Sequence, residues 1–263
     1  MVDVAAVVRD FEAEAAELDG VVNRLTPEQW QLATPAPGWT IAHQIAHLAW
    51  TDEIAVVAVT EPERFSTMAE RAAENVDEYA DRSAHEGAKA PPEELLARWR
   101  ASRRKLADAL LALPAGRKIQ WFGPPMSAAS MATARLMETW AHGQDVVDTL
   151  GIERVPTERL RHVVHIAVRT RDFAYSINGL TPPGEQFRVE LTGPTGQVWT
   201  WGPEDAGQRV TGNALDFALL ATQRRHRDDC AVHAVGPDAE RWLEIAQAFA
   251  GPPGKGRQPG QFA

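Results

Sequence analysis

Apolar residues in the first half of the chain recur at intervals of three and four, which is the spacing of one face of an α-helix. Helix-start and helix-stop signals such as Pro91-Pro92-Glu93 and Leu150-Gly151 delimit these patterns. They predict four long helices, over residues 4–25, 40 to beyond 57, 91–113 and 126–150. A shorter helix is expected over residues 66–82. Long helices joined by modest loops are typical of a bundle.

The pattern changes after Gly151. Residues 155–180 keep a helical spacing, but residues 187–191 and 197–202 alternate between apolar and polar side chains. Because a Gly- and Pro-rich turn joins these two alternating runs, they predict a β-hairpin. The other elements expected here are a strand and two helices, at residues 208–211, 213–224 and 237–250.

A chain of 263 residues is long enough for two domains. We predict a four-helix bundle over residues 1–152 and a small α+β domain over residues 153–250, because the pattern changes between them. The fold class is then α plus α/β in two domains. Residues 251–263 are rich in Gly and Pro, and we predict that they form a flexible tail.

The net charge is −9, from 27 Lys and Arg against 36 Asp and Glu, which argues against a nucleic-acid partner. The single cysteine, Cys230, excludes an intrachain disulfide and a Cys-rich metal site, and we expect it to be a buried small apolar side chain. The first residues lack the basic segment of a signal peptide, and no apolar run reaches the ~18 residues of a membrane span. We therefore expect a soluble, cytoplasmic protein that does not bind a membrane.

Glu138 and His142 are four residues apart, so on a helix they project from one face. The apolar residues around Glu138 indicate burial, where carboxylates are rarely left unpaired. His43 and His47 form a second pair with the same spacing. One of these imidazoles with Glu138 and His142 would give three metal ligands and open coordination positions, as in catalytic zinc sites. The alternative is ordinary surface and core side chains, and spacing alone does not decide.

Several residues near these candidates could complete a site. Asp145, three residues after His142, is either an outer partner that holds a ligand imidazole in one tautomer or a solvated acid, which its polar neighbours favour. Three tryptophans lie within a turn or two of the candidate ligands and could wall a pocket: Trp39, Trp50 and Trp140.

Arg224 and Arg225 belong to a dense cationic segment that follows an apolar helix. The simpler interpretation is an exposed helix end, where positive charge meets the helix dipole favourably. The alternative is a clamp for an anionic group on a substrate or a thiol cofactor.

Two segments carry a resemblance to a known family. Pro37-Gly38-Trp39-Thr40 leads into Ala46-His47-Leu48, and Glu138-x-x-x-His142 is followed by Asp145. With these segments the chain resembles the DinB-like metal-binding superfamily, in particular its mycothiol-dependent maleylpyruvate isomerase type, and is similar to an uncharacterised actinobacterial subgroup.

The resemblance implies a DinB-like four-helix bundle that binds a divalent metal, usually zinc, through His47, Glu138 and His142. His43 then becomes, like Asp145, a candidate outer partner. The second half looks like the small α+β domain of the isomerases, in which an arginine is functionally important. Arg224 and Arg225 are the candidates for that arginine here.

The resemblance also implies an enzyme that uses its metal to activate a low-molecular-weight thiol, mycothiol, for addition to a small electrophilic substrate. Addition followed by elimination would give isomerisation, and addition with loss of a leaving group would give S-transfer. One alternative is a thiol-independent hydrolase or cyclase in which the metal activates water. Another is a non-catalytic protein that binds a metal or a metabolite. The substrate is not carried over with the fold.

Overall fold

The computed structural model describes residues 3–72 and 76–262. The chain divides into two compact units, Met1–Arg154 and Val155–Ala263. The first is helical and the second combines helices with a four-stranded sheet, so the predicted fold class is confirmed. Within the described ranges, no helix is both long enough and apolar enough to cross a membrane.

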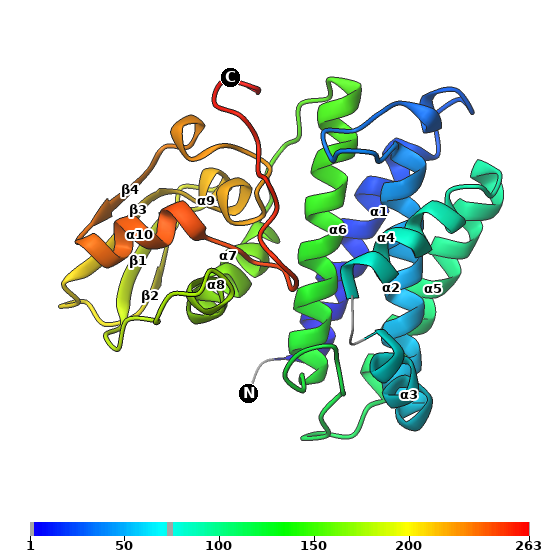
Figure 1. The fold of residues 1–263 in the computed structure, drawn as a ribbon, viewed down its shortest axis with the longest axis horizontal. Coiled ribbons are helices and arrows are strands. Elements are labelled where there is room, and N and C mark those ends of the chain that lie inside the picture. The colour runs from blue at the N-terminus through cyan, green and yellow to red at the C-terminus, as the bar shows by residue number, and fades with distance from the viewer. Residues whose placement is uncertain (1–2, 73–75, 263) are drawn as a thin grey trace. The chain divides into compact units, whose positions relative to one another are not determined.

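Four long helices run side by side in the first unit (Figure 1). They are α1 (Val4–Val22), α2 (Ile41–Thr60), α5 (Pro92–Ala112) and α6 (Ala128–Leu150), and a 3₁₀ turn, η1 (Gln29–Gln31), lies between α1 and α2. These are the four helices that the periodicity predicts. In place of one helix over residues 66–82 the structure has α3 (Pro62–Ala72) and α4 (Val76–Gly87), and residues 73–75 lie outside the described part of the chain.

Local sequence sets the ends of α6, which carries two of the candidate ligands. The Ser127 hydroxyl accepts a hydrogen bond from the Ser130 N–H at 3.1 Å, and so caps the first turn. Gly151 ends the helix in the left-handed conformation, at a φ of 63° that is free of strain only for glycine. The helix between these two signals is long enough to run the length of the bundle.

Helix α2 is buried along most of its length, because neighbouring helices cover it on several sides. The fully buried side chains of Ile41, Ile45 and Leu48 pack in the core with Trp30 and Trp99. This burial explains why α2 reads as a nearly continuous apolar run. Burying a Leu or Ile side chain contributes about 1.5–3 kcal/mol, so the core holds the His47 backbone firmly in place.

The second unit is built on a sheet with the strand order β2-β1-β3-β4. Its strands are β1 (Phe187–Thr192), β2 (Val198–Trp201), β3 (Gln208–Asn213) and β4 (Val232–Val235). The predicted hairpin is present: β1 and β2 pair antiparallel, with Val189 opposite Trp201. Strand β3 pairs parallel with β1 and antiparallel with β4. The helices of this unit are α7 (Leu160–Arg169), α8 (Arg171–Ile177), α9 (Ala214–Ala221) and α10 (Pro237–Ile245), with a 3₁₀ turn, η2 (Arg227–Asp229).

The second unit differs from the sequence expectation in the bounds of its helices and in one additional strand. The helix expected over residues 155–180 starts only at Leu160 and breaks at Thr170. The helices expected over residues 213–224 and 237–250 end earlier, at Ala221 and Ile245. Strand β4 was not predicted. It has only four residues, and its apolar and polar side chains do not alternate regularly. It is recognised as a strand by its pairing with β3.

The last residues contact the segment that follows α9. The Gly254 N–H donates to Gln223 at 3.1 Å, and the Gly260 N–H donates to the Asp229 carboxylate at 2.9 Å. The flexibility expected for residues 251–263 stays a prediction. Cys230, in the same region, is 7% exposed as expected, and burial raises the pKa of its thiol to about 12.

Candidate metal centre

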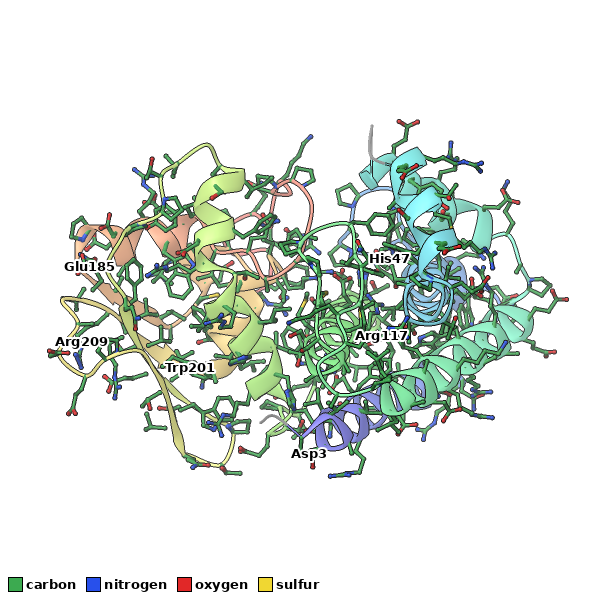
Figure 2. The ribbon with its side chains drawn as sticks, turned by 90° about the horizontal axis from the view of Figure 1, so that it is seen from below. Asp3, His47, Arg117, Glu185, Trp201 and Arg209 are labelled. Carbon is green, nitrogen blue, oxygen red and sulfur yellow. The ribbon has the colours of Figure 1, made fainter. Side chains whose placement is uncertain are left out.

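Three side chains from two helices meet inside the first unit. His47 comes from α2, and Glu138 and His142 come from successive turns of α6; Figure 2 labels His47 among the helices of this unit. The Glu138 Oε2 atom lies 3.2 Å from His142 Nε2 and 3.5 Å from His47 Nε2. The two imidazole rings are 4.6 Å apart between centroids. One ligand atom from each residue lies within 4.8 Å of the other two.

The donor set fits a divalent cation. Two nitrogen or oxygen ligands at about 2.1 Å from a tetrahedral zinc ion lie about 3.4 Å from each other, close to the separations of 3.2 and 3.5 Å observed here. The exposed fractions of the side chains are 13% for each histidine and 21% for Glu138. The cluster is therefore mostly buried but not closed to solvent, which suits three protein ligands with coordination positions left open.

Glu138 is in the protonation state that a metal requires. Burial alone would raise the pKa of the Glu138 carboxyl, but the close imidazoles of His142 and His47 and the charge of Arg135 hold that pKa well below its usual range. Glu138 is therefore a carboxylate at neutral pH. Metal ligands must be deprotonated, so binding here does not first require the loss of a carboxyl proton.

A chain of hydrogen bonds leads outward from His142. Its Nδ1 atom lies 2.5 Å from Gln44 Oε1, and Gln44 Nε2 lies 2.8 Å from Thr34 Oγ1. The Thr34 hydroxyl lies 2.9 Å from the Trp39 carbonyl oxygen. Gln44 is fully buried. The Nδ1 atom of His47 is also buried, and among the described residues it has no hydrogen-bond partner. Sequence reasoning missed Gln44 and Thr34; the available signal was one amide in the otherwise apolar run of α2.

Two of the three predicted pocket tryptophans lie beside the candidate ligands. The Trp39 ring is 5.3 Å from the His47 ring and 5.9 Å from the His142 ring, nearly parallel to the latter. The Trp50 ring is 6.0 Å from that of His47. Trp140 is two residues from Glu138 and therefore lies on a different face of α6. The Arg154 guanidinium lies 5.3 Å above its ring. Trp140 is 3% exposed, and its role as a pocket wall stays a prediction.

His43 and Asp145 were the candidate outer partners. The His43 Nδ1 atom accepts the Thr40 N–H at 3.2 Å at the start of α2, and its ring meets that of His85 at 4.5 Å. Burial, and then the charge of His85, lower the pKa of the His43 imidazole. Asp145 is 0% exposed, so its interpretation as a solvated acid is wrong. Direct support of a ligand by either residue stays a prediction.

Arg224 and Arg225 lie in the second unit, after α9. Arg224 donates to the Thr222 carbonyl at 2.6 Å, and the Arg225 guanidinium stacks 4.3 Å above the ring of Phe262. Both side chains are half-buried. The two arginines are therefore not simply the exposed end of a helix. Their role as an anion clamp stays a prediction.

Comparison with known proteins places this geometry in context. Residues 183–235 match the family described as wyosine base formation. Two uncharacterised proteins of Mycobacterium tuberculosis, one from each of two strains, are 58% identical to the chain over 257 residues, which is 98% of this chain and 100% of each relative.

Solved structures show the same fold. The crystal structure of the mycothiol-dependent maleylpyruvate isomerase aligns with a TM-score of 0.60 at 16% identity, over 90% of this chain and 96% of that one. The crystal structure of a histidine-to-alanine mutant of the isomerase aligns equally well. Residues 11–147, a range that contains all three candidate ligands, match the mycothiol maleylpyruvate isomerase N-terminal domain. Because this match spans more than half of the 263 residues, the chain belongs to the mycothiol maleylpyruvate isomerase N-terminal domain family.

Proposed function

We propose that the protein is a divalent-metal-dependent enzyme that activates mycothiol for addition to a small electrophilic substrate and so catalyses an isomerisation. The observation that carries this proposal is the convergence of His47 Nε2, Glu138 Oε2 and His142 Nε2 at metal-ligand spacing within a partly open site. The family match supports the thiol and the reaction class. S-transfer by the same activated thiol is the related alternative.

Zinc or another divalent ion held by these three residues would act as a Lewis acid and lower the pKa of a bound thiol. The protein residues define the rest of the site. Two neutral imidazoles and one carboxylate leave a divalent ion with one net positive charge, which favours an anionic sulfur. The Trp39 indole stacks on the His142 imidazole and lies at a tilt beside that of His47, where it would limit the access of water.

The proposed reaction balances without an oxidant or a reductant. The thiolate adds to the electron-poor carbon of a double bond conjugated to a carbonyl, and the π electron pair moves to the carbonyl oxygen. The former double bond is then a single bond and can rotate. Return of the electron pair expels the thiolate and restores the double bond in the other geometry, so the thiol is regenerated.

The first test is metal content, measured by plasma mass spectrometry on protein purified without a metal-binding tag. We expect about one divalent ion per chain, as in catalytic zinc sites, and its loss in His47→Ala and Glu138→Gln. His43→Ala is the matched control: it removes the other imidazole of the same helix, four residues away, and should keep the metal. A wild-type protein that contains no divalent ion and takes up no added zinc would overturn the proposal.

The second test is thiol dependence. The metal-loaded protein is assayed with maleylpyruvate and related cis-unsaturated keto acids, with and without mycothiol. Turnover that requires the thiol supports the proposal. Turnover that persists without thiol would favour the hydrolase or cyclase alternative, and thermal stabilisation by these compounds without turnover would favour the non-catalytic one.

A further inference from the structure

Trp39, Thr34 and Gln44 form a chain of hydrogen bonds that ends at His142. Which atom donates in each bond follows from the bond between Thr34 and the Trp39 carbonyl. The Trp39 carbonyl oxygen accepts the Thr34 N–H at 2.8 Å and also lies 2.9 Å from the Thr34 hydroxyl oxygen. A carbonyl oxygen carries no hydrogen, so two oxygens this close require the hydroxyl to donate. The only hydroxyl hydrogen of Thr34 is therefore directed at Trp39.

The orientation of the Gln44 amide follows from this first bond. With its hydrogen committed, Thr34 Oγ1 can act only as an acceptor toward Gln44, so the Gln44 atom 2.8 Å away is the amide nitrogen. The amide oxygen of Gln44 then points in the other direction, to His142. Gln44 is 0% exposed, so water cannot compensate for the opposite orientation.

The tautomer of His142 is the last link. The Gln44 amide oxygen lies 2.5 Å from His142 Nδ1, a distance that requires a hydrogen on this nitrogen. A neutral imidazole has one N–H, so the Nε2 atom of neutral His142 carries a lone pair. That Nε2 atom is the one that lies 3.2 Å from the Glu138 carboxylate.

We propose that Gln44, oriented by Thr34 and the Trp39 carbonyl, is a positioning residue that holds His142 as the Nδ1–H tautomer and directs its Nε2 lone pair at the metal position. This inference deepens the proposed function and rests on its metal site. A lone pair that faces a carboxylate oxygen at 3.2 Å is repelled unless a cation lies between them. The chain of hydrogen bonds thus leaves the Nε2 lone pair of neutral His142 available to a metal ion, next to the carboxylate of Glu138.

The opposite arrangement shows what the direction of the chain prevents. A rotated Gln44 amide would donate to Nδ1, and Nε2–H would then donate to Glu138, closing the site as an ordinary hydrogen-bonded pair. In this arrangement the Thr34 hydroxyl would have to donate to the Gln44 oxygen. The Thr34 hydroxyl oxygen and the Trp39 carbonyl oxygen would then lie 2.9 Å apart with no hydrogen between them. Partners that orient ligand imidazoles typically change metal affinity by about 10–100-fold when they are mutated.

Long-range ¹H–¹⁵N NMR of the imidazoles, on metal-free protein at a pH where histidine is neutral, tests this directly. The His142 signals are assigned by their loss in His142→Ala. We expect the Nδ1–H tautomer in the wild type. Thr34→Val keeps the side-chain shape and touches no candidate ligand, but it removes the hydroxyl that orients Gln44. In this variant we expect a mixture of tautomers and about a tenfold loss of zinc affinity in competition with a chelator.

Thr34→Ser is the matched control, because it restores the hydroxyl, and should restore both the tautomer and the affinity. An Nε2–H tautomer in the wild type, or a Thr34→Val protein with unchanged tautomer and zinc affinity, would overturn the proposal for Gln44 while leaving the metal site intact. A protein with the Nδ1–H tautomer that binds no zinc would instead support the hydrogen-bond chain and overturn the proposed metal-dependent function.

Discussion

Arg135 of α6 forms a buried ion pair with Asp52 of α2: the guanidinium Nε lies 2.9 Å from Oδ1, and the side chains are 3% and 0% exposed. A second guanidinium nitrogen of Arg135 donates to Thr51 at 2.6 Å. Arg135 is one helical turn before Glu138, and Asp52 lies five residues after His47. The pair therefore connects α2 and α6, the two helices that carry the candidate ligands, at a point close to those ligands.

Arg135→Met should destabilise the protein by about 3–5 kcal/mol, because it leaves the Asp52 carboxylate buried without its counter-ion. Urea denaturation followed by far-UV circular dichroism measures this loss. Asp52→Leu in the same chain should recover much of it, since an apolar pair avoids the cost of desolvating two charges.

The control for this prediction is Arg98→Ala. Arg98 also pairs with a carboxylate of α2, Glu53, at 2.6 Å, but the two side chains are 37% and 40% exposed. The expected loss for such an exposed pair is about 0–1 kcal/mol. Equal losses for Arg135→Met and Arg98→Ala would contradict the role assigned to the buried pair.

Helix periodicity was sufficient to predict the bundle, because each long helix buries one continuous face. Periodicity could also place Glu138 and His142 together, since a spacing of four is a local property of one helix. It could not choose between His43 and His47, which share a face of α2. The family resemblance favoured His47, and in the structure the packing of α2 against α6 brings His47 to Glu138, while His43 bonds to Thr40 at the helix start.

The residues that sequence reasoning missed depend on contacts between distant segments. Gln44 meets His142 across 98 positions of the chain, and no local pattern encodes that distance. A contact between distant segments also lies at the break between α7 and α8, where the Thr170 hydroxyl is 2.7 Å from the Gln247 carbonyl oxygen, 77 residues away. The short strand β4 is likewise defined by its pairing with β3 rather than by its own composition.

Asp19 links α1 to α5, and its contribution should depend on pH. Hydrogen bonds from Arg100, opposed by burial and reinforced by Arg103, lower the pKa of the Asp19 carboxyl below its usual value of 3.8. A group with a lowered folded-state pKa stabilises the protein above the unfolded pKa, and this stability is lost as the pH falls through the folded pKa. Asp19→Asn should therefore cost stability at neutral pH, with the difference from wild type shrinking below pH 3.8.

The cost of Asp19→Asn at neutral pH should be about 1–3 kcal/mol, toward the lower end because Arg100 is 39% exposed and water screens it. Urea midpoints measured from neutral to acidic pH give the whole curve. Asp108→Asn, which changes an exposed carboxylate on α5, is the control and should shift the midpoints little. A constant difference between Asp19→Asn and wild type down to the lowest pH would show that the ion pairs are not its cause.

Cys230 should be unreactive in the folded protein. Burial raises the pKa of its thiol to about 12, so at neutral pH about one molecule in 10⁵ carries the reactive thiolate. Ellman's reagent should modify native protein slowly and urea-unfolded protein at the rate of a free thiol. Cys230→Ala should also keep any thiol-dependent turnover unchanged, since the proposed thiol comes from outside the chain. Rapid modification of the native protein would place Cys230 in a more open setting than the structure does.

Asp81 of α4 should hold the Trp39 indole over the candidate ligands. The indole N–H donates to the Asp81 carboxylate at 2.7 Å, and the Trp39 ring lies 5.9 Å from that of His142. Removing one such bond costs about 0.5–1.5 kcal/mol, so Asp81→Ala should reduce the ratio of ordered to displaced Trp39 by about two- to tenfold. Near-UV circular dichroism and tryptophan fluorescence report this displacement, and metal content should stay unchanged. Asp81 also contacts His85, so His85→Ala is the control; if it reproduced the effect on Trp39, the indole would be held through the histidine instead.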